Sequence, residues 1–358
     1  MKKIGIITLH FYENFGSVLQ AYALSEKIKS LYPDADISII NYIPEGSQYT
    51  YFTEQKLLNR YEEKRKLFDI FRHNVLGIPE KTLTAEDLSE LDTFDYLITG
   101  SDQIWNPAIT HLDPAYFLDF ADGKTVKISY AASLAISSSH PQMSDNTFRK
   151  FLPEFDFISI REKEHEEYIQ SFVNKKVETV VDPALLLTRE EYIPIIPQTG
   201  LCNEKYILLY FLTHDPNAID IGNMLAHKYG YKLIHYFADL PDHLFYADSD
   251  EFSFVGPEGF LWYIDNAELV FTNSFHGTVF SILFETPFYT YTVKREMLSR
   301  IIYLTEMLGL ESRRLTGYIR PDDITLVIDF CTARKVIEKK RDEAISFLST
   351  ALDYKTGL

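Results

Sequence analysis

Apolar positions along the first half of the chain gather into short runs that alternate with longer segments of helical periodicity. Short apolar runs such as Lys3–Thr8 suit strands that are buried on both faces, whereas Val18–Leu31 has the spacing of a core-facing helix. This alternation predicts an α/β fold in which helices cover both faces of a parallel sheet. The expected strands are Lys3–Thr8, Ile37–Tyr42, Tyr96–Thr99, Val126–Tyr130, Phe157–Ile160 and Val177–Val181.

A second series of strands and helices follows a break marked by Pro194, Pro197 and Gly200. We therefore expect two doubly wound, Rossmann-like domains that face each other across a ligand-binding cleft. The predicted domains are residues 1–195 and 196–328, and a C-terminal helix in residues 329–358 is expected to pack back on the first domain. The second series comprises a strand at Tyr206–Leu212, a helix at Ala218–Tyr229, a strand at Lys232–Phe237 and a helix at Pro257–Asn266.

Residues 45–91 fit this alternation least well, because they are polar, helical around Gln55–Asn74 and without a clear strand. Two interpretations stay open: an inserted lid, or a helical excursion on the surface with no catalytic part. Aromatic and basic residues between Tyr49 and Arg72 form a candidate surface for peripheral membrane contact.

The segment Phe271–Ser281 holds the strongest candidate chemistry, because a buried strand there leads directly into a helix. Asn273 and Ser274 are good N-cap residues, and the exposed N–H groups of a helix start favour an anion such as phosphate or carboxylate. Gly277 permits close approach, and residue 276 is a histidine, a side-chain type that can donate or accept a proton near neutrality. The alternative is a histidine that only satisfies the helix end.

Composition and charge limit the classes of binding partner and the cellular locations that we expect. With 358 residues, 46% of them hydrophobic, the chain can bury the cores of two domains, and its formal charge of −17 argues against nucleic acid and anionic bilayers as primary partners. No apolar run approaches the roughly 20 residues of a membrane span, and no signal-peptide pattern follows Met1, so a cytoplasmic location is expected. Cys202 and Cys331 are far apart, and Asp248-Ser-Asp250 is interpreted as a solvated loop, so no metal is predicted.

Polar groups also follow other predicted strands. Asn14-Phe-Gly16 precedes a helix, but it matches neither the dinucleotide fingerprint nor the P-loop, so no nucleotide cofactor is predicted. The mixture of small, polar and aromatic side chains in Thr99–Trp105 suits a sugar. The alternative for this loop is a tight turn with Trp105 in the core.

Arg161 ends another predicted strand, and its guanidinium can clamp a carboxylate or a phosphate bidentately. It can equally pair with Glu162 or Glu164. The sequence leaves both roles open.

Taken in order along the chain, several short motifs resemble the polysaccharide pyruvyl transferase family. The resemblance spans roughly residues 3–315, and its strength lies in the order and spacing of motifs that are individually weak. The motifs are Ile7–His10, Asn14–Gly16, Leu19–Ala23, Gly100–Asn106, Tyr130–Ser133, Ser159–Glu162, Val181–Pro183 and Ser274–Ser281.

The resemblance implies a fold of the GT-B type and transfer of the pyruvyl unit of phosphoenolpyruvate to sugar hydroxyls of a surface polysaccharide precursor, with release of phosphate. A ketal is the expected product, and no cofactor is implied. His276 would transfer the proton or bind phosphate, Arg161 would clamp the donor, and Ser274 and Gly277 would hold its phosphate. The acceptor, a sugar or a lipid-linked oligosaccharide, would bind at Asn14, Gly16, Ser101, Asp102, Gln103 and Trp105.

One position departs from the family pattern, since Asn273 stands where many members carry Asp. The missing carboxylate alters the local pKa values or is a simple exchange of cap. Two other functions stay open: a glycosyltransferase that uses a nucleotide-sugar donor, and a non-catalytic glycan-binding protein. The first expectation requires the His276 imidazole and the Arg161 guanidinium to approach one donor from opposite halves of the chain.

Overall fold

The computed structural model divides the chain into two compact units. Unit 1 comprises Met1–Tyr51, Ile70–Leu186 and Lys339–Leu358, and unit 2 comprises Phe52–Asp69 and Leu187–Glu338. The structure describes residues 1–45, 55–91, 93–136, 140–213, 215–237, 255–291, 299–317 and 319–355.

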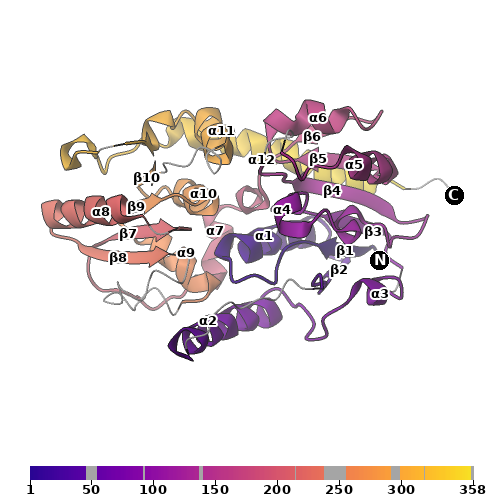
Figure 1. Ribbon diagram of the computed structural model, residues 1–358, viewed down its shortest axis with the longest axis horizontal. Helices are drawn as coiled ribbons and strands as arrows, with labels where there is room; N and C mark the ends of the chain where they lie inside the picture. Colours follow the sequence, from indigo (N-terminus) through magenta and orange to yellow (C-terminus); the bar gives the residue numbers. More distant parts are fainter. Residues whose placement is uncertain are drawn as a thin grey trace. The chain divides into compact units, whose positions relative to one another are not determined.

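Unit 1 is built on a sheet of six described strands, in which every neighbouring pair is parallel (Figure 1). Burial explains the strand sequences, because β1 and β3 are apolar along their length and nearly all of their residues are buried. The sheet order is β2 (Asp36–Ile39), β1 (Lys3–Ile7), β3 (Tyr96–Thr99), β4 (Val126–Ala132), β5 (Phe157–Ile160) and β6 (Val177–Thr179).

The helices of unit 1 begin at polar caps. Asn14 caps α1, since its Oδ1 accepts a hydrogen bond from the N–H of Ser17 at 3.2 Å, and Thr84 and Asp87 form a reciprocal capping box on α3. The described α-helices are α1 (Phe15–Leu31), α2 (Gln55–Asn74), α3 (Ala85–Leu88), α4 (Pro107–Thr110), α5 (Asp145–Phe151) and α6 (Glu166–Gln170), of which α2 begins in the part of the chain that belongs to unit 2.

The C-terminal helix α12 (Cys331–Asp353) ends in unit 1. Its later part packs on the sheet, where the ring of Phe347 lies 6.4 Å from that of Tyr130, and the Nζ of Lys2 donates to the carbonyl of Leu352 at 2.7 Å. The predicted return of this helix to the first domain is confirmed.

Unit 2 has a sheet of five described strands, again parallel throughout. The sheet order is β11 (Arg314–Leu315), β10 (Phe288–Tyr291), β9 (Leu269–Thr272), β7 (Tyr206–Phe211) and β8 (Lys232–Phe237). The accompanying α-helices are α7 (Arg189–Tyr192), α8 (Pro216–Tyr229), α9 (Pro257–Asp265), α10 (Phe275–Leu283) and α11 (Ser299–Leu308).

Both sheets reverse their strand order at an equivalent place. In unit 1, β2 lies on one side of β1, and the following strands, from β3 onward, lie on the other side. In unit 2, β8 lies on one side of β7, and the following strands, from β9 onward, lie on the other side. Doubly wound sheets bind ligands at the carboxyl ends of the strands beside such a reversal. The two units therefore each offer one favoured place for a site.

The α/β class and the parallel sheets predicted from the sequence are confirmed, and β3, β5 and β8 have the predicted bounds. The helix expected around Gln55–Asn74 is α2. Part of the proposed membrane-contact surface, residues 49–54, lies outside the described residues, as does Asp248–Asp250. The elements that were not predicted include β10, α11 and β11, together with the short helices α3 to α7.

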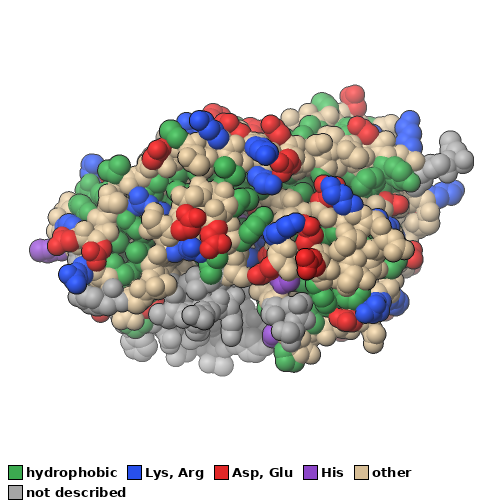
Figure 2. All heavy atoms as spheres, turned by 90° about the horizontal axis from the view of Figure 1, so that it is seen from above, with side chains coloured by type: hydrophobic (Ala, Val, Ile, Leu, Met, Phe, Trp, Pro, Cys, Tyr) green, Lys and Arg blue, Asp and Glu red, His purple; other side chains and the backbone are tan. Residues whose placement is uncertain are grey.

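Charged side chains of both signs are mixed on one face of the molecule. Figure 2 shows Lys and Arg side chains interspersed with Asp and Glu over the face in view. Within the described part of the chain, none of the helices has both the length and the apolar character that crossing a bilayer requires.

Candidate active site at two strand ends

In unit 2, the start of α10 lies at the carboxyl end of β9, beside the reversal of strand order. Ser274 is the N-cap, and its Oγ accepts a hydrogen bond from the N–H of Gly277 at 3.2 Å. The first turn of the helix carries no acidic residue. The positive end of the helix dipole is therefore not neutralised from within its own first turn, which favours a bound anion.

Gly277 is required by the packing of this helix against the sheet. A Cβ atom at this position would lie 2.7 Å from the Oγ1 of Thr272 and 2.8 Å from the Cδ1 of Tyr210. Neither atom is the far end of a flexible chain, so any larger residue would push α10 away from β7 and β9. The glycine thus sets the depth at which the neighbouring His276 lies.

His276 follows the N-cap by two residues and keeps 7% of its surface exposed. Its ring lies 5.2 Å from the ring of Phe275, edge to face. The guanidinium of Arg300, on α11, lies 5.4 Å from the centre of the same Phe275 ring, a cation–π contact. An imidazole, a guanidinium and the first turn of a helix therefore border one aromatic side chain.

Arg300 was missed in the sequence because it stands on a helix that the pattern did not reveal. It is partly buried and follows residues 292–298, which lie outside the described part of the chain. Only packing of α11 on α10 brings it to the site.

Asn273 connects the two strands beside the site. Its Oδ1 accepts from the N–H of Leu212 at 2.7 Å, and its Nδ2 donates to the Oγ1 of Thr213 at 3.3 Å. An aspartate could make the first bond but could not donate the second. The Asn273 side chain therefore links the ends of β7 and β9 by hydrogen bonds, and Ser274 is the N-cap of the helix.

In unit 1, Arg161 lies at the end of β5 in a buried group of charges. Its Nη1 is 2.6 Å from the Oδ2 of Asp182, its Nε is 3.4 Å from the Oε1 of Glu162, and 4% of its side chain is exposed. Although burial disfavours the charge, Asp182, Glu162 and Asp102 raise the pKa of Arg161. The pairing with Glu162 that the sequence left open is present, and Asp182 adds a closer one.

Serine hydroxyls extend this charged group across the strand ends. Ser133 donates to Glu162, and Ser17 on α1 donates to Asp102. Asp102 has a left-handed backbone, with φ of 59°, which is uncommon for a residue with a side chain. The ends of β3, β4, β5 and β6 are thus joined by buried polar contacts.

The residues predicted for the acceptor have structural contacts of their own. Trp105 has no exposed surface, stacks on Phe117 with ring centres 5.6 Å apart, and donates from Nε1 to the carbonyl of Tyr116 at 3.3 Å. This is the core position that the sequence offered as the alternative. Asn14 is the cap of α1 and Gly16 is buried within its first turn.

The other predicted acceptor residues surround the same loop. Ser101 is buried, and its N–H donates to the Oε1 of Gln20 at 3.1 Å. Gln103 is partly exposed and accepts from the Nδ2 of Asn106 at 2.7 Å. The structure therefore brings Ser274, His276 and Gly277 together in unit 2, and Arg161 together with Asp102 in unit 1.

No metal centre is indicated by the geometry: among the described residues, no three His, Cys, Asp or Glu side chains are grouped so as to hold an ion. Cys202 and Cys331 are free thiols.

Two solved structures have a similar fold over nearly the whole chain. UDP-N-acetylglucosamine 2-epimerase from Rickettsia bellii aligns with 99% of this chain and 98% of its own, with a TM-score of 0.55 and 11% identity. UDP-GlcNAc 2-epimerase from Neisseria meningitidis, solved bound to UDP-GlcNAc, aligns with 98% and 99%, with a TM-score of 0.51 and 11% identity. A search among curated proteins found no match. The likeness defines an α/β protein of the GT-B type, as predicted.

The family is established by a separate comparison. Residues 14–295 match the family described as polysaccharide pyruvyl transferase, a range that covers most of the chain and includes both strand-end groups. The protein belongs to the polysaccharide pyruvyl transferase family, which places it among the transferases of polysaccharide biosynthesis.

Proposed function

We propose that the protein transfers the pyruvyl unit of phosphoenolpyruvate to two hydroxyls of one sugar in a polysaccharide precursor, forming a cyclic ketal and releasing phosphate. The observation that carries the proposal is the family match over residues 14–295, combined with an anion-favouring helix start and an adjacent imidazole. The donor is a small anion with a phosphate and a carboxylate. The start of α10 and the guanidinium of Arg300 supply two positive groups for it.

His276 is the proton-transfer group in this proposal. As imidazolium it donates a proton to the methylene carbon of the enol, and the adjacent carbon becomes cationic and is attacked by the first sugar hydroxyl. The resulting imidazole accepts the proton of that hydroxyl, which restores the imidazolium. The second hydroxyl then forms the other C–O bond as the C–O bond to phosphate breaks, and its proton leaves with the phosphate. The sum is one phosphoenolpyruvate and one diol converted to one ketal and one phosphate.

Arg161 has a different place in this scheme from the donor clamp that the family resemblance implied. Its charge is already met by Asp182 and Glu162 at short distances in a buried setting. We propose that it positions the ends of β5 and β6, and that Arg300 takes the larger part in binding the donor. Arg161 is then a positioning residue.

The test is incubation with phosphoenolpyruvate and a panel of free and lipid-linked sugars, in which inorganic phosphate and the mass of the sugar product are measured. Stoichiometric phosphate together with a pyruvylated sugar is expected. A parallel incubation with UDP-sugars and no phosphoenolpyruvate gives no product under this proposal. Glycosylated product in that parallel reaction, or no pyruvylation of any acceptor, would contradict it.

A further inference from the structure

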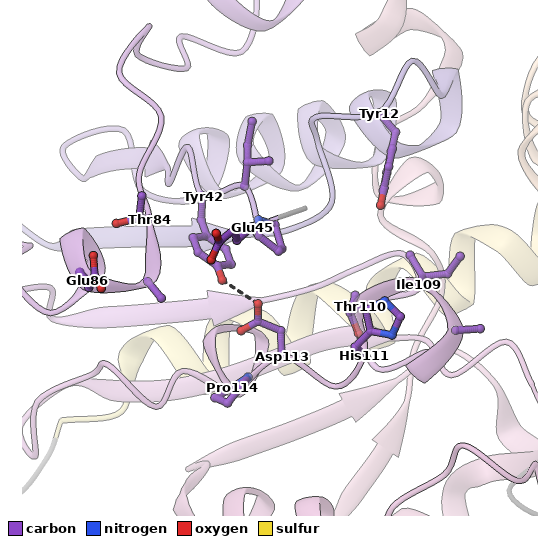
Figure 3. A pocket seen from close by; sticks show the side chains of 14 residues that line it. Tyr12, Tyr42, Glu45, Thr84, Glu86, Ile109, Thr110, His111, Asp113 and Pro114 are labelled. Atoms are coloured by element: carbon purple, nitrogen blue, oxygen red, sulfur yellow. Dashed lines mark hydrogen bonds between the residues drawn. The ribbon is translucent and has the colours of Figure 1, made fainter. Parts of the chain in front are cut away.

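Unit 1 contains a pocket of about 1080 Å³, and none of the residues assigned so far is among those that line it (Figure 3). Its wall is formed by segments that follow β1, β2 and β3: Tyr12 after β1, Tyr42 to Glu45 after β2, and residues 108–114 after β3. Residues 84–86 complete it. The pocket is therefore at the carboxyl ends of the strands beside the reversal of order, where doubly wound folds bind ligands.

The charge of the pocket selects against the donor. Glu45, Glu86 and Asp113 line it, and none of the described residues that line it is a lysine or an arginine. A phosphorylated carboxylate would meet three carboxylates and, among the described lining residues, neither lysine nor arginine. A neutral molecule rich in hydroxyl groups, by contrast, can donate hydrogen bonds to those oxygens.

Aromatic and apolar side chains give the pocket flat surfaces. In Figure 3, Tyr12 points across the space toward Ile109 and His111, and Tyr42 lies beside Glu45 on the opposite part of the wall. Flat rings next to carboxylates suit a pyranose, which has apolar C–H faces and polar edges. The volume is at the upper end of the range for drug-sized ligands, enough for about two to three sugar rings.

Contacts behind the wall hold these side chains in place. The hydroxyl of Tyr42 donates to the Oδ2 of Asp113 at 2.6 Å, and burial together with this carboxylate raises the pKa of Tyr42, so the hydroxyl stays protonated. Arg72 donates to the carbonyls of His10 and Tyr12, each at 2.7 Å, and so fixes the loop after β1. Tyr42, Asp113 and the backbone after β1 are thus held by contacts within the protein before a ligand binds, which favours affinity.

We infer that this pocket binds a neutral oligosaccharide segment of the acceptor, with Tyr12 as its stacking surface and Glu45, Glu86 and Asp113 as acceptors for its hydroxyls. The inference deepens the proposed function, because it assigns the acceptor to a pocket separate from the positive groups of unit 2. It also replaces the buried Trp105 loop as the place where a sugar contacts unit 1.

The first experiment measures binding without any reaction. Full-length protein is applied to an array of neutral and acidic oligosaccharides in the absence of phosphoenolpyruvate, alongside its Tyr12→Ala, Tyr12→Phe and Tyr354→Ala variants. We expect binding to neutral glycans, a loss of about tenfold or more in Tyr12→Ala, and little change in Tyr12→Phe, which keeps the ring. Tyr354 is an exposed tyrosine outside the pocket, so Tyr354→Ala controls for loss of any surface ring.

The inference is overturned if no neutral glycan binds, if only acidic glycans bind, or if Tyr12→Ala binds as tightly as the unmodified protein. Thermal unfolding of each variant shows whether a loss of binding is due to a loss of folding. Glu86→Gln is a second variant, at an exposed residue. One weakened hydrogen bond should lower its glycan affinity about threefold.

Turnover then distinguishes this inference from the proposed function. Pyruvyl transfer with an unchanged acceptor KM in Tyr12→Ala would refute the pocket and leave the reaction standing. Neutral glycan binding that depends on Tyr12, without any transfer from phosphoenolpyruvate, would refute the reaction and leave the pocket standing.

Discussion

The carboxyl ends of the strands carry different arrangements of charge in the two units. In unit 1 the guanidinium of Arg161 is enclosed by Asp182 and Glu162, so positive and negative charges neutralise each other within the protein. In unit 2 the start of α10 is surrounded by the hydroxyl of Ser274, the amide of Asn273 and the ring of His276, with no acidic residue in its first turn. The arginine of unit 1 is thus paired with carboxylates of the protein, whereas the first turn of α10 has no acidic residue that would offset the helix dipole.

This difference distinguishes residues that stabilise the fold from residues that are available to bind a substrate. A buried ion pair resists a competing anion, because the anion would have to displace a carboxylate already within 2.6 Å of the guanidinium. The first turn of α10 contains no acidic residue, so no carboxylate of that turn competes with an anion. An arginine at a strand end is therefore weak support for anion binding until its partners are known.

The largest expected effect comes from removing the reacting group of unit 2. His276→Ala should lower kcat for phosphate release by about 10²- to 10⁴-fold, the usual range for general acid–base groups. Steady-state phosphate release is the measurement, with circular dichroism as the check on folding. Asn273→Asp is the matched variant beside it and should stay within about tenfold of the unmodified protein. A His276→Ala enzyme with unchanged kcat would remove the imidazole from the mechanism.

The next effect concerns stability in unit 1. Arg161→Met leaves Asp182 and Glu162 buried without their cation, and the free energy of unfolding should fall by about 3–5 kcal/mol. Chemical denaturation measures it. Arg189→Met removes a more exposed pair with Asp265 and should cost about 1 kcal/mol or less. Equal losses in the two variants would mean that burial does not distinguish these pairs.

A smaller effect is expected on donor binding. Arg300→Ala should raise the KM for phosphoenolpyruvate about tenfold, because one charge-assisted contact is lost, whereas Arg300→Lys should keep part of the affinity. Arg334→Ala is the control, since Arg334 is an exposed arginine of unit 2 paired with Glu285. The assignment of Arg300 fails if its KM follows that of the control, or if only the acceptor KM changes.

The last prediction concerns the pH dependence of stability that a second buried histidine causes. His10 is 1% exposed and, within the described structure, neither ring nitrogen has a hydrogen-bond partner. Burial, with a contribution from the charge of Arg72, lowers its pKa from 6.5 to about 3. Between these values the unfolded chain binds a proton that the folded chain does not, so stability is full above pH 6.5 and declines as the pH falls toward 3.

The slope from this one group is at most about 1.4 kcal/mol per pH unit. Denaturation at pH 7, 6, 5 and 4 measures it, and His10→Gln should flatten the dependence over that range. An unchanged slope in His10→Gln would show that other groups cause any loss of stability in acid.

Much of the fold could be predicted because most strands of the two parallel sheets are short runs rich in apolar residues. The bounds of β3, β5 and β8 follow directly from such runs. β11 has two residues, Arg314–Leu315, and only partial burial, so its sequence carries no comparable signal. Short edge strands are defined by their neighbour rather than by their own composition.

The candidate site was predictable where it is local in sequence. Ser274, His276 and Gly277 lie within four residues, and the strand-to-helix junction alone indicates their arrangement. Arg300, the pairing of Arg161 with Asp182 and the pocket at Tyr12 depend on packing between segments that are distant in the chain. The Trp105 loop shows the converse: its mixed composition suggested a sugar, although its aromatic ring belongs to the core.

The contribution of α12 to unit 1 has a consequence for synthesis on the ribosome. Phe347 packs on Tyr130 and Phe157, and Asp353 pairs with Lys2, so the strands of unit 1 receive this covering helix only after the residues of unit 2 have been synthesised. Until then, apolar surface of the nascent chain stays open to water and to chaperones. A premature stop before this helix should therefore yield an aggregating product, even though every residue of the charged strand ends has already been made.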